Sequence, residues 1–345
     1  MPAYHGRSEG PDATDGGLPG LVNSRRAIFT APVASVALVA LGAALWGTDG
    51  AFRQPLVSPV PRWSPYTIVL YEHVILTAVV APYLIPRIRS LRRLDGGGWL
   101  AAIGVAWGGS ALATLAFTTA FEYGNPDVVV LLQKTQPLWA IAAAAVVMHE
   151  RPLRQLGWFL APALVGTYLL SFGDMSPADA FTGAQGKAAL LALVAAALWG
   201  AATAFGRRTL VALEPQLVTA LRFTLALPLL LVIALYEGAV APPAAAHASD
   251  WPRLVGLALI PGLAALLLYY RGLVHTPASV ATFAELAFPA TALIVNYFVL
   301  GASVSGTQLI GFGILWVTIA MLHRLPVELP ATGESLAIRP ASAAG

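Results

Sequence analysis

Residues 42–52 read GAALWGTDGAF, and residues 195–205 read AAALWGAATAF. The two stretches start 153 residues apart (195 minus 42) and are identical at seven of eleven positions. A second correspondence has nearly the same spacing, because Pro137 and Pro289 lie 152 residues apart in similar apolar surroundings. Two correspondences at one spacing indicate that the chain is built from two related halves.

The composition is that of a membrane protein. Of 345 residues, 57% are hydrophobic and 11% are charged, whereas a soluble domain has about 25% charged residues. The mean hydropathy is +0.72. The absence of Cys excludes disulfides, thiolate metal sites and cysteine nucleophiles, and we expect no cofactor or metal. A formal net charge of +3 provides no basic surface for nucleic acid, so the expected partners are the lipid bilayer and a small-molecule substrate.

Windows of about 20 apolar residues predict an all-α integral membrane fold with ten transmembrane helices. The ten windows cover residues 32–54, 66–86, 98–120, 126–148, 152–173, 187–208, 215–236, 252–271, 277–300 and 304–323. Residues 1–30 and 326–345 are rich in Gly, Pro, Ala and Ser, which predicts disordered tails. The two five-helix halves then span residues 31–173 and 174–325.

The distribution of arginine and lysine predicts the orientation. If the N-terminus is cytoplasmic, twelve arginines beside the expected helices lie in cytoplasmic segments. The segments on the outer side of the membrane contain four basic residues, Arg53, Arg62, Lys187 and Arg253. The positive-inside rule therefore places both termini in the cytoplasm of a multi-pass plasma-membrane protein. Because five is odd, the second half must run upside down relative to the first. Inverted repeats are typical of alternating-access transporters, whose substrate site lies near the midplane between the repeats.

The chain resembles the EamA-type members of the drug/metabolite transporter superfamily. The resemblance rests on the two LWG elements, on FEYGNPDVVVLLQKTQPLWAIAAAAVVMHERP at residues 121–152, and on ALRF at residues 220–223. It covers essentially all ten expected helices and implies a twice-repeated carrier that moves small metabolites, often outward, through a central cavity. Family members often end the fourth helix of both halves in Glu. Here Glu150 fills that position, but its counterpart is Ala302 or Ser303.

Four ionisable residues fall inside predicted spans, where each costs about 2.5–3.5 kcal/mol and marks a candidate functional site. They are Glu72, Lys134, Arg222 and Glu285. Glu72 corresponds to Arg222 and Lys134 to Glu285 under the repeat, with the sign of the charge reversed each time. One hypothesis is that Glu72 pairs with Lys134 and Arg222 with Glu285, as buried ion pairs that hold helix two to helix four and helix seven to helix nine. The other is that these residues are coupling or gating charges, with at least one acid exchanging its partner for a proton or a cationic group.

Two proline-containing helices supply the candidate substrate contacts. Pro137 and Pro289 are expected to break helices four and nine, freeing carbonyl groups at the depth where carriers bind substrates. The candidate substrate-binding residues around these breaks and the LWG elements are Trp46, Gln133, Lys134, Gln136, Trp199, Thr282 and Asn296. Simple helix bending is the alternative for the prolines, and anchoring at the membrane interface is the alternative for the two tryptophans.

Three further side chains are expected at the edges of the membrane. Tyr269 and Tyr270 lie near the inner end of helix eight and are predicted to be interfacial, and Asp49 is predicted to contact water at the outer end. The last two helices of each half are candidates for a homodimer surface.

The favoured function is secondary active transport of a small polar metabolite such as an amino acid, with export as the expected direction and proton coupling as a hypothesis. The alternatives are an intramembrane enzyme and a channel. An enzyme is disfavoured because the sequence has no HEXXH, no GxSxG and no Gly-rich phosphate loop. A channel would need a continuous polar lining or a ring of subunits. We therefore expect no catalytic residues.

Overall fold

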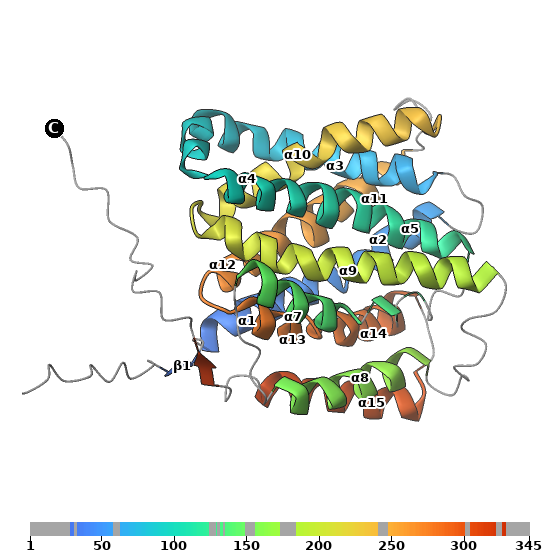
Figure 1. Cartoon of the computed structure of the whole chain (residues 1–345). Coiled ribbons are helices and arrows are strands. Elements are labelled where there is room, and N and C mark those ends of the chain that lie inside the picture. Colours follow the sequence, from blue (N-terminus) through green and yellow to red (C-terminus); the bar gives the residue numbers. More distant parts are fainter. Residues whose placement is uncertain are drawn as a thin grey trace, which may run out of the picture.

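The computed structural model of the chain describes residues 28–30, 33–57, 63–123, 129, 132–133, 135–148, 156–172, 184–240, 248–300, 304–321 and 326–328. These residues form a bundle of helices with one short pair of strands (Figure 1). The helices of the first half are α1 (Val33–Trp46), α2 (Asp49–Val57), α3 (Pro65–Leu84), α4 (Gly96–Ile103), α5 (Ala113–Tyr123), α7 (Gln136–Val147) and α8 (Leu156–Phe172). A 3-10 segment, Ile85–Arg93, continues α3, and π-helical turns over Gly104–Leu112 join α4 to α5.

The second half has a related order of elements, with one long helix, α9, in the place of α1 and α2. Its helices are α9 (Ala184–Leu210), α10 (Pro215–Tyr236), α11 (Asp250–Leu257), α12 (Ala265–Leu273), α13 (Ala278–Ala284), α14 (Ala287–Leu300) and α15 (Gly306–Met321). The π-helical turns Ala258–Ala264 join α11 to α12. They lie about 152 residues after the π-helical turns of the first half, so the duplication extends to a local irregularity of the backbone.

Seven apolar helical stretches of the described chain are long enough to cross a bilayer: Val33–Arg53, Pro65–Arg93, Gly96–Ala120, Gly186–Leu210, Pro215–Tyr236, Asp250–Leu273 and Ala278–Val299. Three shorter apolar helices, Gln136–Val147, Trp158–Leu169 and Gly306–Thr318, lie in the other windows that the sequence predicts as spans. The protein is therefore a helical, multi-pass membrane protein.

Local sequence signals fix the helix ends. Ser64 caps α3 by accepting a hydrogen bond from the Thr67 N–H at 3.2 Å, and Pro65 occupies the first turn, where its missing N–H costs nothing. Asp95 caps α4 by accepting from the Gly98 N–H at 2.6 Å. Gly238 follows the end of α10 with a φ of 61°, a left-handed conformation that glycine adopts without a side-chain clash.

The equivalent helices α3 and α10 pack side by side and run in opposite directions. At one end the Thr67 hydroxyl donates to the Ala239 carbonyl at 2.5 Å, so the start of α3 meets the end of α10. At the other end the Tyr83 hydroxyl donates to Glu214 at 2.6 Å, so the end of α3 meets the start of α10. Residues the same number of positions from the start of α3 and of α10 therefore lie toward opposite ends of the bundle.

Gly47, the glycine of the first LWG element, allows α1 to cross the start of α14 closely. A Cβ atom at Gly47 would lie 2.7 Å from the Phe288 carbonyl oxygen, 2.8 Å from Cβ of Thr291 and 2.9 Å from the Ala292 nitrogen. No side chain fits such a gap without moving the backbone. This contact joins the two halves.

Gly200, the glycine of the second LWG element, makes the reciprocal contact. A Cβ atom there would lie 2.7 Å from the Ala140 nitrogen, 2.7 Å from Cβ of Trp139 and 2.9 Å from the Gln136 carbonyl oxygen. Adding 152 to these three positions gives residues 288, 291 and 292, which are the contacts of Gly47. Each half thus presents its LWG glycine to the proline-containing helix of the other.

A short pair of strands, β1 (Ile28–Thr30) and β2 (Pro326–Glu328), joins the two ends of the helical region in antiparallel register, with Phe29 opposite Val327. The sequence analysis places these six residues in disordered tails, so the pairing adds an element that the composition does not predict. Residues 1–27 and 329–345 lie outside the described part of the chain. Figure 1 shows the pair at one end of the bundle, beside the start of α1.

Candidate functional site

Glu285 lies at the break between α13 and α14. Its backbone N–H closes the last turn of α13 on the Ala281 carbonyl at 3.0 Å, and its own carbonyl accepts from the Phe288 N–H at 3.0 Å. Pro289 stands in the first turn of α14 and has no N–H to donate four residues back, to Glu285. The chain therefore changes course at the residue that carries the acid.

Neutral donors from three other helices surround the Glu285 carboxylate. The Tyr269 hydroxyl of α12 donates to Oε1 at 2.7 Å, and the Thr203 hydroxyl of α9 donates to the same oxygen at 3.2 Å. The amide of Gln136, at the start of α7, donates to Oε2. Only 9% of Glu285 is exposed. The site thus collects α7 from the first half and α9, α12 and α13 from the second half around one buried acid.

Two neighbouring polar groups have no hydrogen-bond partner in the described structure. Gln133 donates from its amide nitrogen to Oε1 of Gln136 at 2.7 Å, but its own amide oxygen is buried without a donor. The hydroxyl of Thr282, in α13 one turn before Glu285, is also buried without a partner. A buried polar atom left without a hydrogen bond costs about 1–3 kcal/mol. Both groups therefore have an unused hydrogen-bonding capacity next to Glu285.

The two LWG tryptophans pack in equivalent ways inside the bundle. The Trp46 ring lies 4.9 Å from the Tyr269 ring, and the Trp199 ring lies 5.1 Å from the Phe117 ring, measured between ring centres. Phe117 and Tyr269 are themselves equivalent, 152 residues apart. The Trp199 indole N–H also donates to the carbonyl of Gly109 at 2.8 Å. Only the second half has a hydroxyl on this aromatic partner, and that hydroxyl binds Glu285.

The interfacial position expected for Tyr269 and Tyr270 is wrong. Tyr269 is 2% exposed and Tyr270 is fully buried, and both belong to the main core cluster. Their position near a helix end suggests the interface, but α1 covers this face of α12, with Gly42 seated against Tyr269. Helix packing, which hydropathy does not report, decides their environment.

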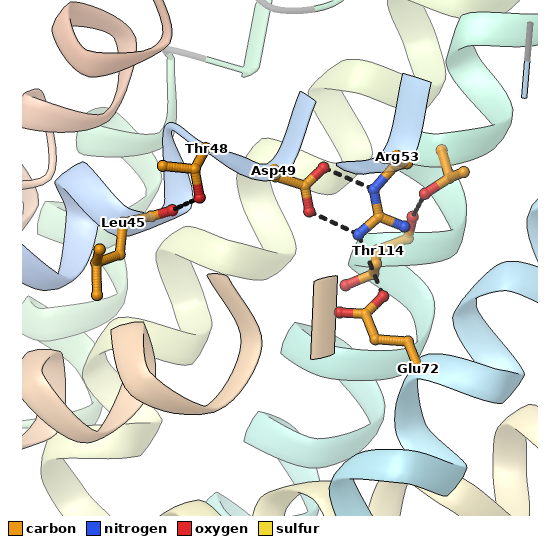
Figure 2. Close-up of polar contacts among 7 residues, drawn as sticks. Leu45, Thr48, Asp49, Arg53, Glu72 and Thr114 are labelled. Carbon is orange, nitrogen blue, oxygen red and sulfur yellow. Dashed lines mark hydrogen bonds and ion pairs between the residues drawn. The ribbon is translucent and has the colours of Figure 1, made fainter. Parts of the chain in front are cut away.

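A second polar cluster, the Asp49–Arg53–Glu72 triad, lies where α2 meets α3. Arg53 donates from Nε and from Nη2 to the two oxygens of Asp49, at 2.7 Å each, and from Nη2 to Glu72 at 3.1 Å. Figure 2 shows the guanidinium of Arg53 between the two carboxylates. Arg53 and Glu72 are each 7% exposed. A buried acid, Glu72, and a partly buried acid, Asp49, therefore share one buried base.

Arg222, the repeat equivalent of Glu72, has different partners. It donates from Nε to the hydroxyl of Ser110 at 2.5 Å and from Nη1 to the hydroxyl of Tyr270 at 3.0 Å. Both partners are neutral. Among the described residues, the ion pairs include none formed by Arg222. This half of the molecule therefore has a charge near the membrane interior that neutral groups hold in place.

The structure thus rearranges the charge couples expected from the sequence. Glu72 pairs with Arg53, an arginine that the sequence analysis counts as an outside loop residue, and Arg222 meets hydroxyl groups. Lys134 lies outside the described residues, and of Asn296 only the backbone, within α14, is described. Pro137 occupies the first turn of α7. Of the expected substrate residues, Trp46, Gln133, Gln136 and Thr282 lie around Glu285, and Trp199 is one helical turn from Thr203, whose hydroxyl contacts its carbonyl.

Sequence reasoning missed several members of these clusters, namely Asp49, Arg53, Ser110, Thr203, Tyr269 and Tyr270 as polar contacts. For Arg53 a signal was present, because an acid and an arginine four residues apart on a helix form an ion pair. For Tyr269 the signal was its equivalence to Phe117. For Ser110 and Thr203 the sequence has no comparable signal, since hydroxyl residues are common in apolar helices.

Comparisons with known proteins agree with this architecture. The EamA-like transporter family matches twice, over residues 33–172 and over residues 186–324. The chain is 28% identical over 291 residues to the riboflavin transporter ImpX of Fusobacterium nucleatum subsp. nucleatum. This alignment covers 84% of the chain and 97% of the relative. A solved crystal structure at 20% identity superposes with a TM-score of 0.67, over 84% of this chain and 98% of the other, and so supports the fold. The two matches contain the two halves that cross at Gly47 and Gly200, and the chain belongs to the EamA-like transporter family of membrane transporters.

Proposed function

We propose that this transporter is a secondary active carrier that moves a small polar metabolite by alternating access between its two halves. The observation that supports this most directly is the reciprocal crossing of Gly47 on α14 and Gly200 on α7. Two rigid half-molecules that meet at equivalent crossings rock about a shared centre with little internal rearrangement. The neutral donors around Glu285 lie at that centre, on helices from both halves.

The proposed topology is ten spans in two inverted five-helix halves with both termini cytoplasmic. Pairing of β1 with β2 brings the entry to the first helix and the exit from the last together, which supports an even number of crossings. The seven long stretches alone would leave these ends on opposite sides. Counting the three shorter apolar helices as spans gives ten. The opposed directions of α3 and α10 support the inversion of the second half.

The proposed substrate site consists of Trp46, Gln133, Gln136, Thr282 and Glu285. Aromatic rings favour stacking with a flat solute, and unmatched amide and hydroxyl groups favour a solute with several hydrogen-bonding atoms at its edge. A flavin has both properties, and a relative at 28% identity carries riboflavin in its name. We therefore take riboflavin as the first substrate to test, with amino acids as the alternative class.

Glu285 is the proposed coupling residue. In the conformation described, neutral donors stabilise its carboxylate in a buried setting. A rocking motion that separates the halves would withdraw Gln136 and leave the acid with fewer donors. Loss of hydrogen bonds to a buried carboxylate favours its protonated form. Proton binding and release at Glu285 would thereby follow the transport cycle. Export is the proposed direction, following the family resemblance.

The test is transport in proteoliposomes that contain the purified full chain. With riboflavin inside, an imposed pH gradient should drive net riboflavin flux through the wild type, and Glu285→Gln should abolish that response. The same variant should still exchange labelled for unlabelled riboflavin at equal pH, because exchange needs the site but not net proton movement. Exchange also separates a carrier from a channel, since only a carrier is accelerated by substrate on the far side.

Metabolite profiling of cells that overproduce the wild type or Glu285→Gln tests the substrate and the direction. A compound enriched in the medium only with the wild type identifies an exported substrate. Amino acids in place of flavins would replace the proposed substrate class and leave the carrier mechanism in place. Equal pH-driven flux through both proteins would show that Glu285 is structural.

A further inference from the structure

We propose that Arg222 binds an oxyanion of the transported solute, a carboxylate or a phosphate ester, beside the site at Glu285. This inference rests on the proposed transport function and extends it from a polar solute to one with an anionic group. The sequence marks Arg222 as a gating or coupling charge, whereas its contacts leave it equipped for direct binding.

Arg222 has donors to spare. A guanidinium carries five N–H groups, and the structure uses two of them, one to Ser110 and one to Tyr270. Three remain: one on Nη1 and two on Nη2. The two terminal nitrogens together form the fork that matches two oxygens of a carboxylate or phosphate. Arg222 is only partly buried, and its contacts with the described residues include no hydrogen bond from Nη2.

The charge of Arg222 also lacks an acid among the described residues, although it lies within the span Pro215–Tyr236. At the equivalent position, Glu72 has its counter-charge built in, from Arg53. The residue of the second half that corresponds to Arg53 is Gly206, and a Cβ atom there would lie 2.9 Å from the Tyr270 ring. Position 206 of the second half is therefore closely packed and carries no counter-charge for Arg222. A bound anion supplies the missing charge.

Arg222 is within reach of the proposed substrate site. Its Nη1 binds the Tyr270 hydroxyl, and the rings of Tyr269 and Tyr270 lie 5.6 Å apart. Tyr269 in turn binds Glu285. The acid and the base thus stand on the two sides of one tyrosine pair. Gly109 keeps the fork open, because a Cβ atom there would come within 3.3 Å of Nη2 of Arg222.

The test compares riboflavin with riboflavin 5′-phosphate, which differ by one phosphate ester. Dissociation constants are measured by flavin fluorescence for the full chain in lipid nanodiscs. The wild type should bind the phosphate ester about tenfold to a hundredfold more tightly, as expected for charge-assisted hydrogen bonds. Arg222→Gln should bind both compounds equally, with the riboflavin constant unchanged. Arg208→Gln, which removes an arginine at the end of α9, is the matched control and should keep the wild-type preference.

Arg222→Lys keeps the charge but loses the fork, and should retain part of the preference, which separates anion binding from a folding defect. A preference that survives Arg222→Gln, or that the wild type lacks, overturns the proposal. The proposal is also overturned if inorganic phosphate binds at Arg222 and strengthens riboflavin binding, because the anion would then be a separate ligand and not a part of the solute.

If the wild type binds neither flavin, riboflavin is rejected as the substrate, and anion binding by Arg222 is tested separately. Inorganic phosphate and acetate are then added in place of the flavins, and thermal unfolding is followed against chloride at equal ionic strength. Stabilisation of the wild type and of Arg208→Gln, but not of Arg222→Gln, supports the anion site. Equal stabilisation of all three proteins overturns it.

Discussion

The two halves of this transporter carry opposite charges at equivalent positions of their repeated structure. Glu72 in α3 and Arg222 in α10 are equivalent, and because these helices are antiparallel the two charges lie toward opposite ends of the bundle. Glu72 is closed off by Arg53, whereas Arg222 is held by two hydroxyl groups. The duplication thus preserved the backbone while one end became a closed ion cluster and the other an open cation.

The aromatic pairs differ in the same manner. Trp46 on Tyr269 and Trp199 on Phe117 have similar distances between ring centres, 4.9 and 5.1 Å, with interplanar angles of 46° and 62°. A single hydroxyl, that of Tyr269, connects the second-half aromatic to the acid. The scaffold therefore repeats its shape, while the polar groups attached to it differ between the two halves. A carrier needs matching shapes for its two end states, but it needs only one substrate site.

The largest expected effect is at Arg53. Arg53→Gln leaves Asp49 and Glu72 without their shared cation, and removing one partner of a buried ion pair costs about 3–5 kcal/mol. We expect the Arg53→Gln variant to give much less monodisperse protein in detergent and to unfold at a clearly lower temperature than the wild type. Arg222→Gln, at the open cation, should lose much less stability because its partners are neutral.

Adding Glu72→Gln to Arg53→Gln should recover more than half of the lost stability, because one buried acid is removed with its base. Equal stability of Arg53→Gln and Arg222→Gln would contradict the distinction between a closed ion cluster at Glu72 and an open cation at Arg222.

The glycine crossings test the symmetry itself. Gly47→Ala and Gly200→Ala each force a Cβ atom to within 2.9 Å of the backbone of the other half. Each substitution should cost about 1–3 kcal/mol, as for overpacked cores, and the two losses should agree. Gly313→Ala, in α15 with open space around it, is the control and should be neutral or stabilising. Clearly unequal losses would mean that the two crossings differ in rigidity.

Tyr269→Phe makes the second half resemble the first. The variant loses the hydrogen bond to Glu285 and should be destabilised by about 1 kcal/mol, with pH-driven transport falling more than exchange. The measurement is proteoliposome flux beside thermal unfolding. Tyr83→Phe removes a hydroxyl that binds Glu214 at the exposed end of α3, and transport by this control should match the wild type. Unchanged coupling in Tyr269→Phe would separate the tyrosine from the proton step.

The smallest effect is expected at an ion pair outside the bilayer. Asp95 and Arg208 join α4 to α9 at 2.8 Å, with the Asp95 side chain 65% exposed and the Arg208 side chain 29% exposed. The hydrogen bond from the Gly98 N–H, with a further contribution from Arg208, lowers the pKa of Asp95. A lowered pKa gives stability that is present above the unfolded-state pKa of about 3.9 and is lost as the pH falls through the folded-state value.

Asp95→Asn keeps the helix cap and removes the titration. Thermal unfolding between pH 3 and pH 5 should be slightly less dependent on pH in the variant than in the wild type, and at pH 7 the variant should be slightly less stable, with the two proteins converging at pH 3. A large loss at pH 7 would mean that an exposed pair rivals the buried triad, contrary to the usual weakness of exposed ion pairs.

Much of this protein was readable from its sequence. Hydropathy and the LWG repeat identified a duplicated helical membrane protein, and the chain matches its family in two halves as the repeat requires. Glu72, Arg222 and Glu285 were found because a charge in an apolar window is rare and costly. The sequence did not reveal the true partners of these charges. Arg53 read as a loop arginine and Tyr269 as an interfacial ring.

What the sequence determined by itself is therefore the set of apolar helices, the duplication and the charges that need an explanation. These follow from local composition and periodicity, which the bilayer imposes on each helix separately. Only the tertiary structure decided that Gly47 meets α14, that Gly200 meets α7, and that Arg53 reaches Glu72. Those contacts depend on how helices distant in sequence approach one another, and at that range backbone shape and steric fit decide which side chains meet.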